Sequence, residues 1–246
     1  MKKYLLLILT LVLAFCFLAC NKKETKTIKV GASSTPHALI LEQTKPFLET
    51  KGYKLEIVVF DDYVLPNLSL ENNELDANYF QHEPYLNEFN KSNNTHIVSV
   101  FKVHFEPMGI YAGKKNSLDD YKTGDKIVVP SDKSNYDRAV ELLKVNGIED
   151  AELVLVEAQN IPLALQDCDF AVINGNYALA SNVLDKCLVT ESKTSDIALT
   201  MANIIAVKEG NENNEKIKAL IEALKQTNVE DYIKREFGNS VISIMK

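Results

Sequence analysis

Short apolar runs alternate with amphipathic stretches along most of the chain after residue 28. Residues 28–33 predict a strand, and Pro36 then opens a helix that we expect to reach about Thr50, because proline is tolerated in a first helical turn. Residues 55–60 are nearly continuous in apolar side chains, which is typical of a strand covered on both faces. This order predicts an α/β protein.

The stretch 75–85 joins a strand pattern directly to a helix start. Residues 77–81 alternate as in a strand, and the chain turns at His82 into a helix with Pro84 near its first turn. An α/β sheet usually binds its ligand where strands end and helices begin, and this point carries aromatic, amide and imidazole side chains. The alternative is an ordinary buried strand capped by polar residues.

The same alternation continues to the end of the chain. We expect further strands at 97–103, 126–130, 153–156, 169–174, 188–190 and 198–207. We expect further helices at 64–72, 82–91, 117–121, 135–145, 161–166, 176–184, 213–226 and 229–237. Because a similar alternation restarts after Gly113, the sequence predicts two α/β blocks, two sheets and therefore two lobes.

The N-terminus has the pattern of a lipoprotein signal peptide. Lys2 and Lys3 precede an apolar run over 5–18, and Ala19 is followed by Cys20 and a polar stretch. We expect residues 1–19 to be removed, Cys20 to become the acylated first residue, and 20–27 to be a tether. The alternative is an uncleaved membrane anchor, for which the apolar run is short.

Composition excludes several classes of protein. The formal net charge of −7 argues against nucleic acid as a partner, and sparse glycine and proline argue against low-complexity segments. Metalloprotease and serine-hydrolase motifs are absent from the sequence, as are Cys/His clusters at metal spacing, so we expect no enzyme, no cofactor and no metal. Cys168 and Cys187 either pair or remain buried thiols; their spacing does not decide.

Arginine usage points to one position. Arg138 and Arg235 are the only arginines among 27 basic residues. A guanidinium binds a carboxylate through two parallel hydrogen bonds, which lysine cannot copy. Arg138 lies near a predicted helix N-terminus, where backbone N–H groups also favour an anion. The alternatives are a surface salt bridge from Arg138 to Asp137 or Glu141; Arg235 has the pattern of exposed surface.

Other side chains suit the remaining parts of an amino acid. Asn174 ends an apolar strand, and Asn203 interrupts another, where a buried amide needs a partner. Tyr63 and Phe80 are able to sandwich an apolar or thioether side chain, and His82 to hydrogen-bond as a neutral imidazole. The alternatives are structural hydrogen bonds for the amides, core packing for the aromatics and a helix cap for His82.

Several motifs together resemble the methionine-binding lipoproteins that serve ABC importers, the MetQ/NlpA-like family. These motifs lie at 60–67, 76–85, 129–138, 171–177 and 203–209. The resemblance implies a two-lobed, type II periplasmic-binding-protein-like α/β fold. Each lobe has a mainly parallel sheet flanked by helices, and the ligand cleft lies between the lobes. It implies that lobe 1 spans 28–107 and 202–246, that lobe 2 spans 108–201, and that crossovers lie near 106–111 and 195–201.

The resemblance also implies a function and a set of ligand-binding residues. These residues are Tyr63, Phe80, His82, Arg138, Asn174 and Asn203. The implied function is capture of L-methionine, or a close relative, and its delivery to an ABC importer permease with its ATPase. The protein is then a monomer on the extracytoplasmic face of the cell membrane, held by the lipid on Cys20.

One departure from the family pattern keeps other functions open. The chain is distinctly shorter between Arg138 and Asn174, as if a helix-sized piece of lobe 2 were missing. The alternatives are therefore a binding protein for D-methionine, a methionyl peptide or another small amino acid. A further alternative is a surface lipoprotein or adhesin with a vestigial cleft.

Overall fold

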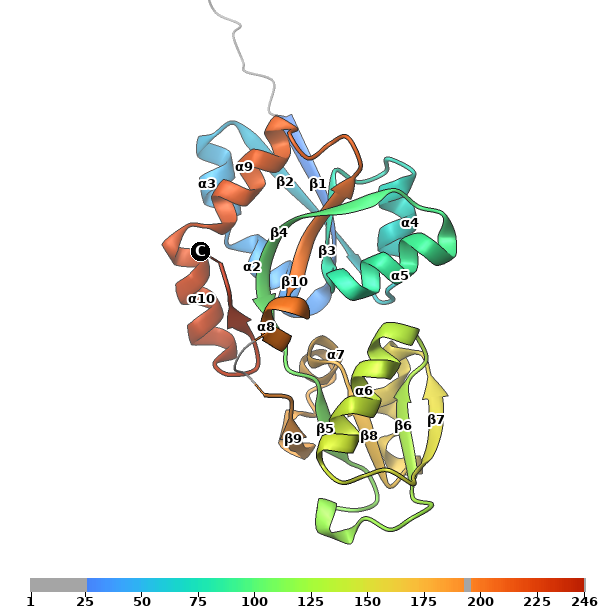
Figure 1. The fold of residues 1–246 in the computed structure, drawn as a ribbon. Helices are drawn as coiled ribbons and strands as arrows, with labels where there is room; N and C mark the ends of the chain where they lie inside the picture. The colour runs from blue at the N-terminus through green and yellow to red at the C-terminus, as the bar shows by residue number, and fades with distance from the viewer. Residues whose placement is uncertain (1–25, 193–195, 246) are drawn as a thin grey trace, which may run out of the picture.

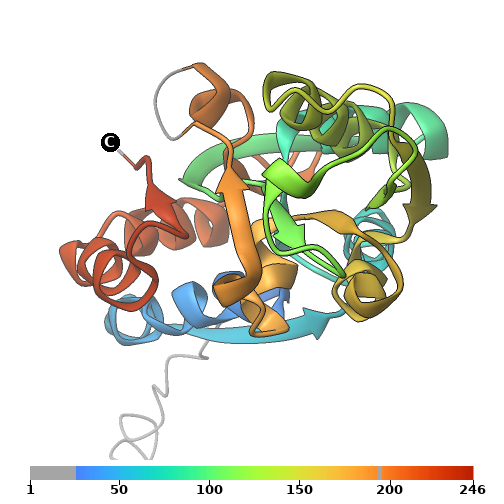
Figure 2. The same ribbon diagram turned by 90° about the horizontal axis from the view of Figure 1, so that it is seen from below.

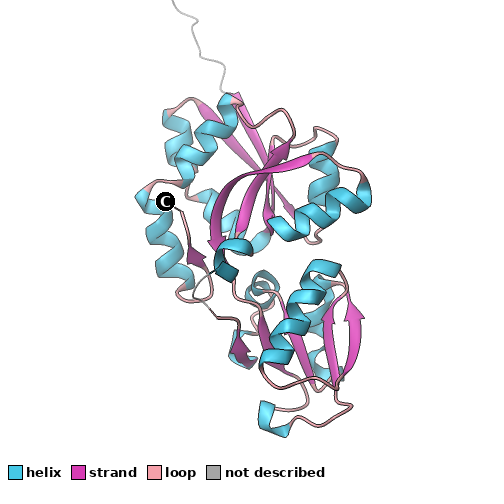
Figure 3. Ribbon diagram, in the orientation of Figure 1, coloured by secondary structure: helices cyan, strands magenta, loops and turns pink. Residues whose placement is uncertain are grey.

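The two predicted blocks form two sheets, one above the other in Figure 1. The computed structural model describes residues 26–192 and 196–245. The predicted signal peptide and the lipidation site Cys20 lie outside these residues. Figure 3 shows that helices flank both sheets, and the predicted two-lobed α/β fold is confirmed.

The larger lobe is built on a six-stranded sheet of order β11-β4-β10-β3-β1-β2. Its strands are β1 (Lys26–Ser33), β2 (Tyr53–Phe60), β3 (Ala77–His82), β4 (Ile97–Phe105), β10 (Asn203–Lys208) and β11 (Ile242–Ser243). Strand β1 pairs in parallel with β2 and β3, whereas β10 runs antiparallel to β3 and β4. The expectation of a mainly parallel sheet is wrong for this lobe: the sheet is mixed, because β10 enters from the other lobe in the opposite direction and β11 also pairs antiparallel with β4.

Helices cover both faces of this sheet. They are α2 (Leu39–Glu42), α3 (Lys45–Thr50), α4 (Leu65–Glu71), α5 (Glu83–Asn93), α9 (Glu215–Leu224) and α10 (Thr227–Phe237). Figures 1 and 2 show the C-terminal helices, in red, beside the N-terminal ones, in blue. The predicted helix 36–50 is divided: a π-helical turn (Ser34–Ala38) precedes α2, and the Thr44 hydroxyl donates to the Leu41 carbonyl between α2 and α3.

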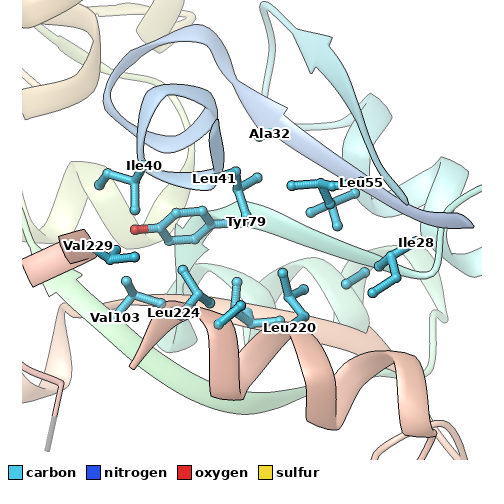
Figure 4. Close-up of a cluster of buried hydrophobic side chains, with 14 of the residues drawn as sticks. Ile28, Ala32, Ile40, Leu41, Leu55, Tyr79, Val103, Leu220, Leu224 and Val229 are labelled. Atoms are coloured by element: carbon cyan, nitrogen blue, oxygen red, sulfur yellow. The ribbon is translucent and has the colours of Figure 1, made fainter. Parts of the chain in front are cut away.

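The main core lies between this sheet and α2, α3, α9 and α10. Figure 4 shows the Tyr79 ring from β3 packed among Ile40, Val103 and Leu224. On the other face Leu70 of α4 and Leu86 of α5 pack against β10. Strand β10 alternates between the two cores and is apolar on both faces, as a covered strand must be.

The smaller lobe is built on a five-stranded sheet of order β7-β6-β8-β5-β9. Its strands are β5 (Gly109–Ala112), β6 (Lys126–Pro130), β7 (Glu152–Val156), β8 (Phe170–Ile173) and β9 (Cys187–Thr190). The covering helices include α6 (Lys133–Val145), α7 (Gly175–Ala180) and a 3-10 helix (Ala158–Asp167). Strands β7, β6 and β8 are parallel, and β5 is antiparallel to both neighbours. Cys168 and Cys187 are not joined by a disulfide.

Two connections link the lobes. The first is short, because β4 ends at Phe105 and β5 begins at Gly109. The second runs from Thr190 to Asn203 and contains α8 (Asp196–Thr200). The predicted strand 198–207 is therefore wrong in its first part, since a short apolar run fits a helical turn as well as a strand.

Hydrogen bonds join the two connections. The Glu191 amide donates to the Met108 carbonyl at 2.9 Å, and the Met108 amide donates to Glu191 Oε2 at 2.8 Å.

Within residues 26–192 and 196–245, the helices are too short or too polar to cross a bilayer.

Candidate functional site

A small cavity of about 20 Å³ lies where the two lobes meet. All six residues predicted from the sequence line it. The lining is Tyr63, Phe80, Gln81, His82, Tyr85, Glu106, Asn135, Arg138, Asn174, Gly175, Asn176 and Asn203. A volume of this size holds about one water molecule, so a ligand as large as an amino acid enters only if the walls move apart.

His82 is both the last residue of β3 and the N-cap of α5. Its Nδ1 accepts a hydrogen bond from the Tyr85 amide at 3.2 Å, so the ring proton lies on Nε2. Nε2 then donates to Asn135 Oδ1 at 3.1 Å, a contact between the two lobes. Burial and the neighbouring Arg138 charge lower the pKa of His82 to about 3, so the imidazole is neutral.

Arg138 is buried and makes a bidentate ion pair. Its Nε and Nη2 donate to the two Glu191 carboxylate oxygens at 2.8 and 2.6 Å, and Nη2 also donates to the Glu106 carbonyl at 2.9 Å. The Glu191 pair excludes the surface salt bridges to Asp137 or Glu141 considered above; Asp137 pairs with Lys133 instead. Among the described residues no hydrogen-bond partner reaches the Arg138 Nη1.

Helix α6 begins at Lys133, two residues before the predicted start. Asp132 caps it by accepting from the Asn135 amide at 3.0 Å. Arg138 therefore lies in the second turn, where backbone N–H groups are already bonded within the helix. The expected contribution of the helix N-terminus to anion binding at Arg138 is wrong.

The two asparagines have different surroundings. Asn174 directly follows β8, as predicted, and its amide Nδ2 donates to Asn135 Oδ1 at 2.9 Å. Its Oδ1 is buried and has no hydrogen-bond partner among the described residues. Asn203 begins β10 instead of interrupting a strand, and its Oδ1 pairs with His37 Nε2 at 2.9 Å. Because buried acceptors rarely stay unpaired, Asn174 Oδ1 needs a donor inside the cavity.

Aromatic rings form one wall of the cavity. The ring centroid of Tyr63 lies 5.7 Å from that of Phe80, 5.6 Å from Tyr85 and 4.9 Å from Tyr177. Tyr63 and Phe80 thus contact each other here instead of facing across a slot. The Tyr63 hydroxyl donates to Asn176 Oδ1 at 2.6 Å, which is another contact between the lobes.

Sequence reasoning missed Glu106 and two histidines beside it. Glu106 lies in the first connection, and its Oε1 is 2.6 Å from His104 Nε2 and 3.3 Å from His37 Nε2. The other ring nitrogens contact the hydroxyls of Tyr79 and Ser33. Burial raises the pKa of Glu106. The polar residues His104 and Glu106 inside the apolar run of 103–112 were a usable signal for both, whereas His37 comes from a distant element.

Two amides of the cavity wall were also missed. Asn135 and Asn176 lie inside motifs that the sequence did single out, beside Arg138 and Asn174. The neighbouring Gln81 is held by Asn67 of α4, with Nε2 donating to Asn67 Oδ1 at 2.7 Å, so its side chain has a structural role.

Comparison with known proteins identifies the family. A family model described as NlpA lipoprotein matches residues 28–151 and 149–245. The methionine-binding lipoprotein MetQ of Bacillus subtilis is 33% identical over 275 aligned residues, covering 99% of each chain. The two matched segments overlap at residues 149–151, between Arg138 and Asn174, where we expect this chain to be shorter than the family pattern.

Solved structures agree in fold. A lipoprotein of Ruminococcus gnavus is 47% identical, with a TM-score of 0.86 over 89% of this chain and 99% of that one. A nutrient-binding protein of Burkholderia cenocepacia, solved with bound methionine, is 32% identical, with a TM-score of 0.83 over 89% of this chain and all of that one. Because the match spans both lobes and the connections between them, the chain belongs to the NlpA lipoprotein family.

Proposed function

We propose that this protein captures a free amino acid, with L-methionine as the first candidate, outside the membrane and delivers it to an ABC importer. The observation that carries this proposal is that one cavity has both a cation and an unpaired hydrogen-bond acceptor in its wall. Arg138 lines the cavity as a cationic donor, and Asn174 Oδ1 is a buried acceptor without a partner among the described residues. An amino acid brings a carboxylate for the first and an ammonium for the second.

Methionine is favoured by the relatives and by the aromatic wall. The Bacillus subtilis relative is named a methionine-binding lipoprotein, and the Burkholderia cenocepacia structure contains methionine. A thioether packs well against aromatic rings, which Tyr63, Phe80 and Tyr85 supply. In this proposal His82 and Asn203 complete the polar lining.

Ligand capture requires the lobes to separate and close again. Among the described residues, the hydrogen bonds between the lobes include Tyr63 to Asn176, His82 to Asn135, and the Tyr177 hydroxyl to the Asp61 carbonyl at 3.0 Å. Separation breaks these bonds while leaving each sheet intact. A ligand that contacts both walls stabilises the closed form and shifts the population towards it.

The remaining parts of the proposal follow from the sequence and the family. Acylation of Cys20 would hold the protein at the extracytoplasmic face of the membrane, with residues 20–27 as a tether. We propose that it acts there as a monomer and presents the closed, loaded form to a permease driven by an ATPase.

The decisive variant is Arg138→Lys. Lysine keeps the charge but cannot make a bidentate pair with Glu191 and still reach the ligand, so we expect L-methionine affinity to fall about 100-fold, the loss of roughly 2–3 kcal/mol of charged hydrogen bonding. Titration calorimetry of the full chain in detergent measures this. Arg235→Lys, on the exposed face of α10, is the matched control and should bind L-methionine as tightly as the unchanged protein.

Two outcomes would contradict the proposal. Unchanged affinity in a folded Arg138→Lys protein would remove Arg138 from the site. Native mass spectrometry of the freshly purified chain, followed by a panel of amino acids, tests the ligand class. If none is carried and none binds, the alternative of a surface lipoprotein with a vestigial cleft takes precedence.

A further inference from the structure

Glu106 is a carboxylate built into the inner wall of the cavity. It is 5% exposed, and both of its oxygens are closely surrounded. Oε1 contacts His104 and His37, as described above. Oε2 lies over Gly175, where an added Cβ would be 3.0 Å from that oxygen and 2.8 Å from the Glu106 Cβ. Glycine at 175 therefore leaves the space that the carboxylate occupies.

His104 gives Glu106 a hydrogen bond and His37 a polar contact at 3.3 Å, but neither gives it a positive charge. His37 Nε2 faces the Asn203 amide oxygen, and His104 Nε2 faces the carboxylate, so each ring carries its proton on Nε2 and presents Nδ1 to a hydroxyl. Burial lowers the pKa of His37 to about 4 and that of His104 to about 3. Both rings are therefore neutral at physiological pH.

The nearby cation, Arg138, already forms an ion pair with Glu191. Arg138 pairs with both oxygens of Glu191 and donates to the Glu106 backbone carbonyl. Burial raises the pKa of the Glu106 carboxyl, although the Arg138 charge and a hydrogen bond from the Asn176 amide act to lower it. A buried carboxylate without its own counter-ion is energetically costly. A cation that enters the cavity would relieve this cost.

Three acceptors for an ammonium belong to the wall of this one cavity. The Glu106 carboxylate, Asn174 Oδ1 and Asn203 Oδ1 all belong to residues that line the cavity. Asn174 Oδ1 has no partner among the described residues, and Asn203 Oδ1 retains a second lone pair. An ammonium group has three N–H donors, which matches three acceptors.

We propose that Glu106, oriented by His37 and His104, is the receptor for the α-ammonium group of the ligand. This inference rests on the proposed function, since it assumes an amino-acid ligand. Arg138 bonds to the Glu106 carbonyl itself, so the two charged subsites come from adjoining groups. The site thus selects a carboxylate and an ammonium on the same carbon. It rejects N-acylated amino acids and 2-hydroxy acids, which lack the ammonium group. It also rejects peptides, whose charged ends are farther apart.

The test compares ligands that differ only at the amine. L-Methionine, 2-hydroxy-4-(methylthio)butanoate and N-acetyl-L-methionine are titrated into the full chain in detergent. We expect the last two to bind at least 100-fold more weakly than methionine. A hydroxy acid that binds as tightly as methionine would overturn the inference, even with methionine binding intact and the proposed function standing.

The same series with Glu106→Gln assigns the effect to that carboxylate. Glutamine keeps the size and removes the charge, so methionine should lose about 100-fold in affinity while the hydroxy acid changes little. Glu215→Gln, which removes a charge from the exposed face of α9, is the control. An unchanged ratio between the two ligands in Glu106→Gln would assign the ammonium to another group.

The cluster also has the composition of a metal site, so the experiment must distinguish ammonium binding from metal binding. His37, His104 and Glu106 offer ligand atoms that all lie within 4.8 Å of one another. We expect neither EDTA nor added Zn²⁺ to change methionine binding. Stoichiometric zinc binding that competes with methionine, and that is lost in His104→Gln, would replace the ammonium receptor with a metal site.

Discussion

Arg138 lies where three parts of the chain meet. From α6 it pairs with Glu191 in the second connection and bonds to the Glu106 carbonyl in the first. Because a guanidinium has donors on two sides, it bonds to both connections at once. A lysine cannot make both contacts with this geometry, which explains an arginine in a chain whose cations are almost all lysines.

Tyr63 shows how a single hydroxyl stabilises the closed form. It donates to Asn176 Oδ1 at 2.6 Å across the lobes, so Tyr63→Phe removes one of the bonds between them. We expect methionine affinity to fall about 5- to 10-fold, the equivalent of about 1 kcal/mol. Calorimetry measures this, with Tyr53→Phe at the opposite end of β2 as control. Equal affinities would show that the bond does not contribute to closure.

At the scale of elements, the site depends on where strands stop. Strand β3 ends at His82 and β8 at Ile173, and each leads at once into a helix that begins at the cavity. The short connection after β4 adds Glu106 to the same place. Since backbone pairing is lost at strand ends, their polar side chains become available for a ligand.

The C-terminal helices stabilise the larger lobe without touching the cavity. Leu224 of α9 is fully buried against the six-stranded sheet. Leu224→Ala should lower the free energy of unfolding by about 2–5 kcal/mol. The methionine affinity of this variant, measured at a temperature where it is folded, should equal that of the unchanged protein. Urea unfolding measures the first effect, and exposed Leu163→Ala is the control. A variant that binds weakly while fully folded would link α9 to the site.

At the scale of the whole molecule, three buried neutral histidines make stability depend on pH. His37, His82 and His104 have pKa values lowered to about 4, 3 and 3 from 6.5. Below pH 6.5 the unfolded chain takes up protons that the folded protein does not, so stability falls on acidification by up to about 1.4 kcal/mol per pH unit per histidine.

Glu106 acts in the opposite direction. Its raised pKa means that the folded protein binds a proton more readily than the unfolded chain just above pH 4.5, which offsets one histidine there. We therefore expect a net loss of stability between pH 6.5 and 5, seen as a falling urea midpoint. A free energy of unfolding that stays constant from pH 7 to pH 5 would show that these histidines are not neutral in the folded protein.

Local patterns in the sequence were sufficient for most of the fold and for six residues of the cavity wall. Apolar periodicity located the strands and helices, and the turn at His82 was visible because a strand pattern meets a proline-marked helix start. The predictions from short apolar runs were wrong, because a few apolar residues fit either structure. Residues 198–200 are helical and not part of a strand, and the helix predicted over 36–50 is divided.

The sequence by itself determined the order of elements, the family and the residue types that face the cavity, since these depend on spacing along the chain. Only the tertiary structure decided how those residues are paired. It brought Glu191 to Arg138, and His37 to Glu106, from elements far apart in the sequence. Burial then set the protonation of the histidines, because the cost of a buried charge depends on surroundings that the whole fold supplies.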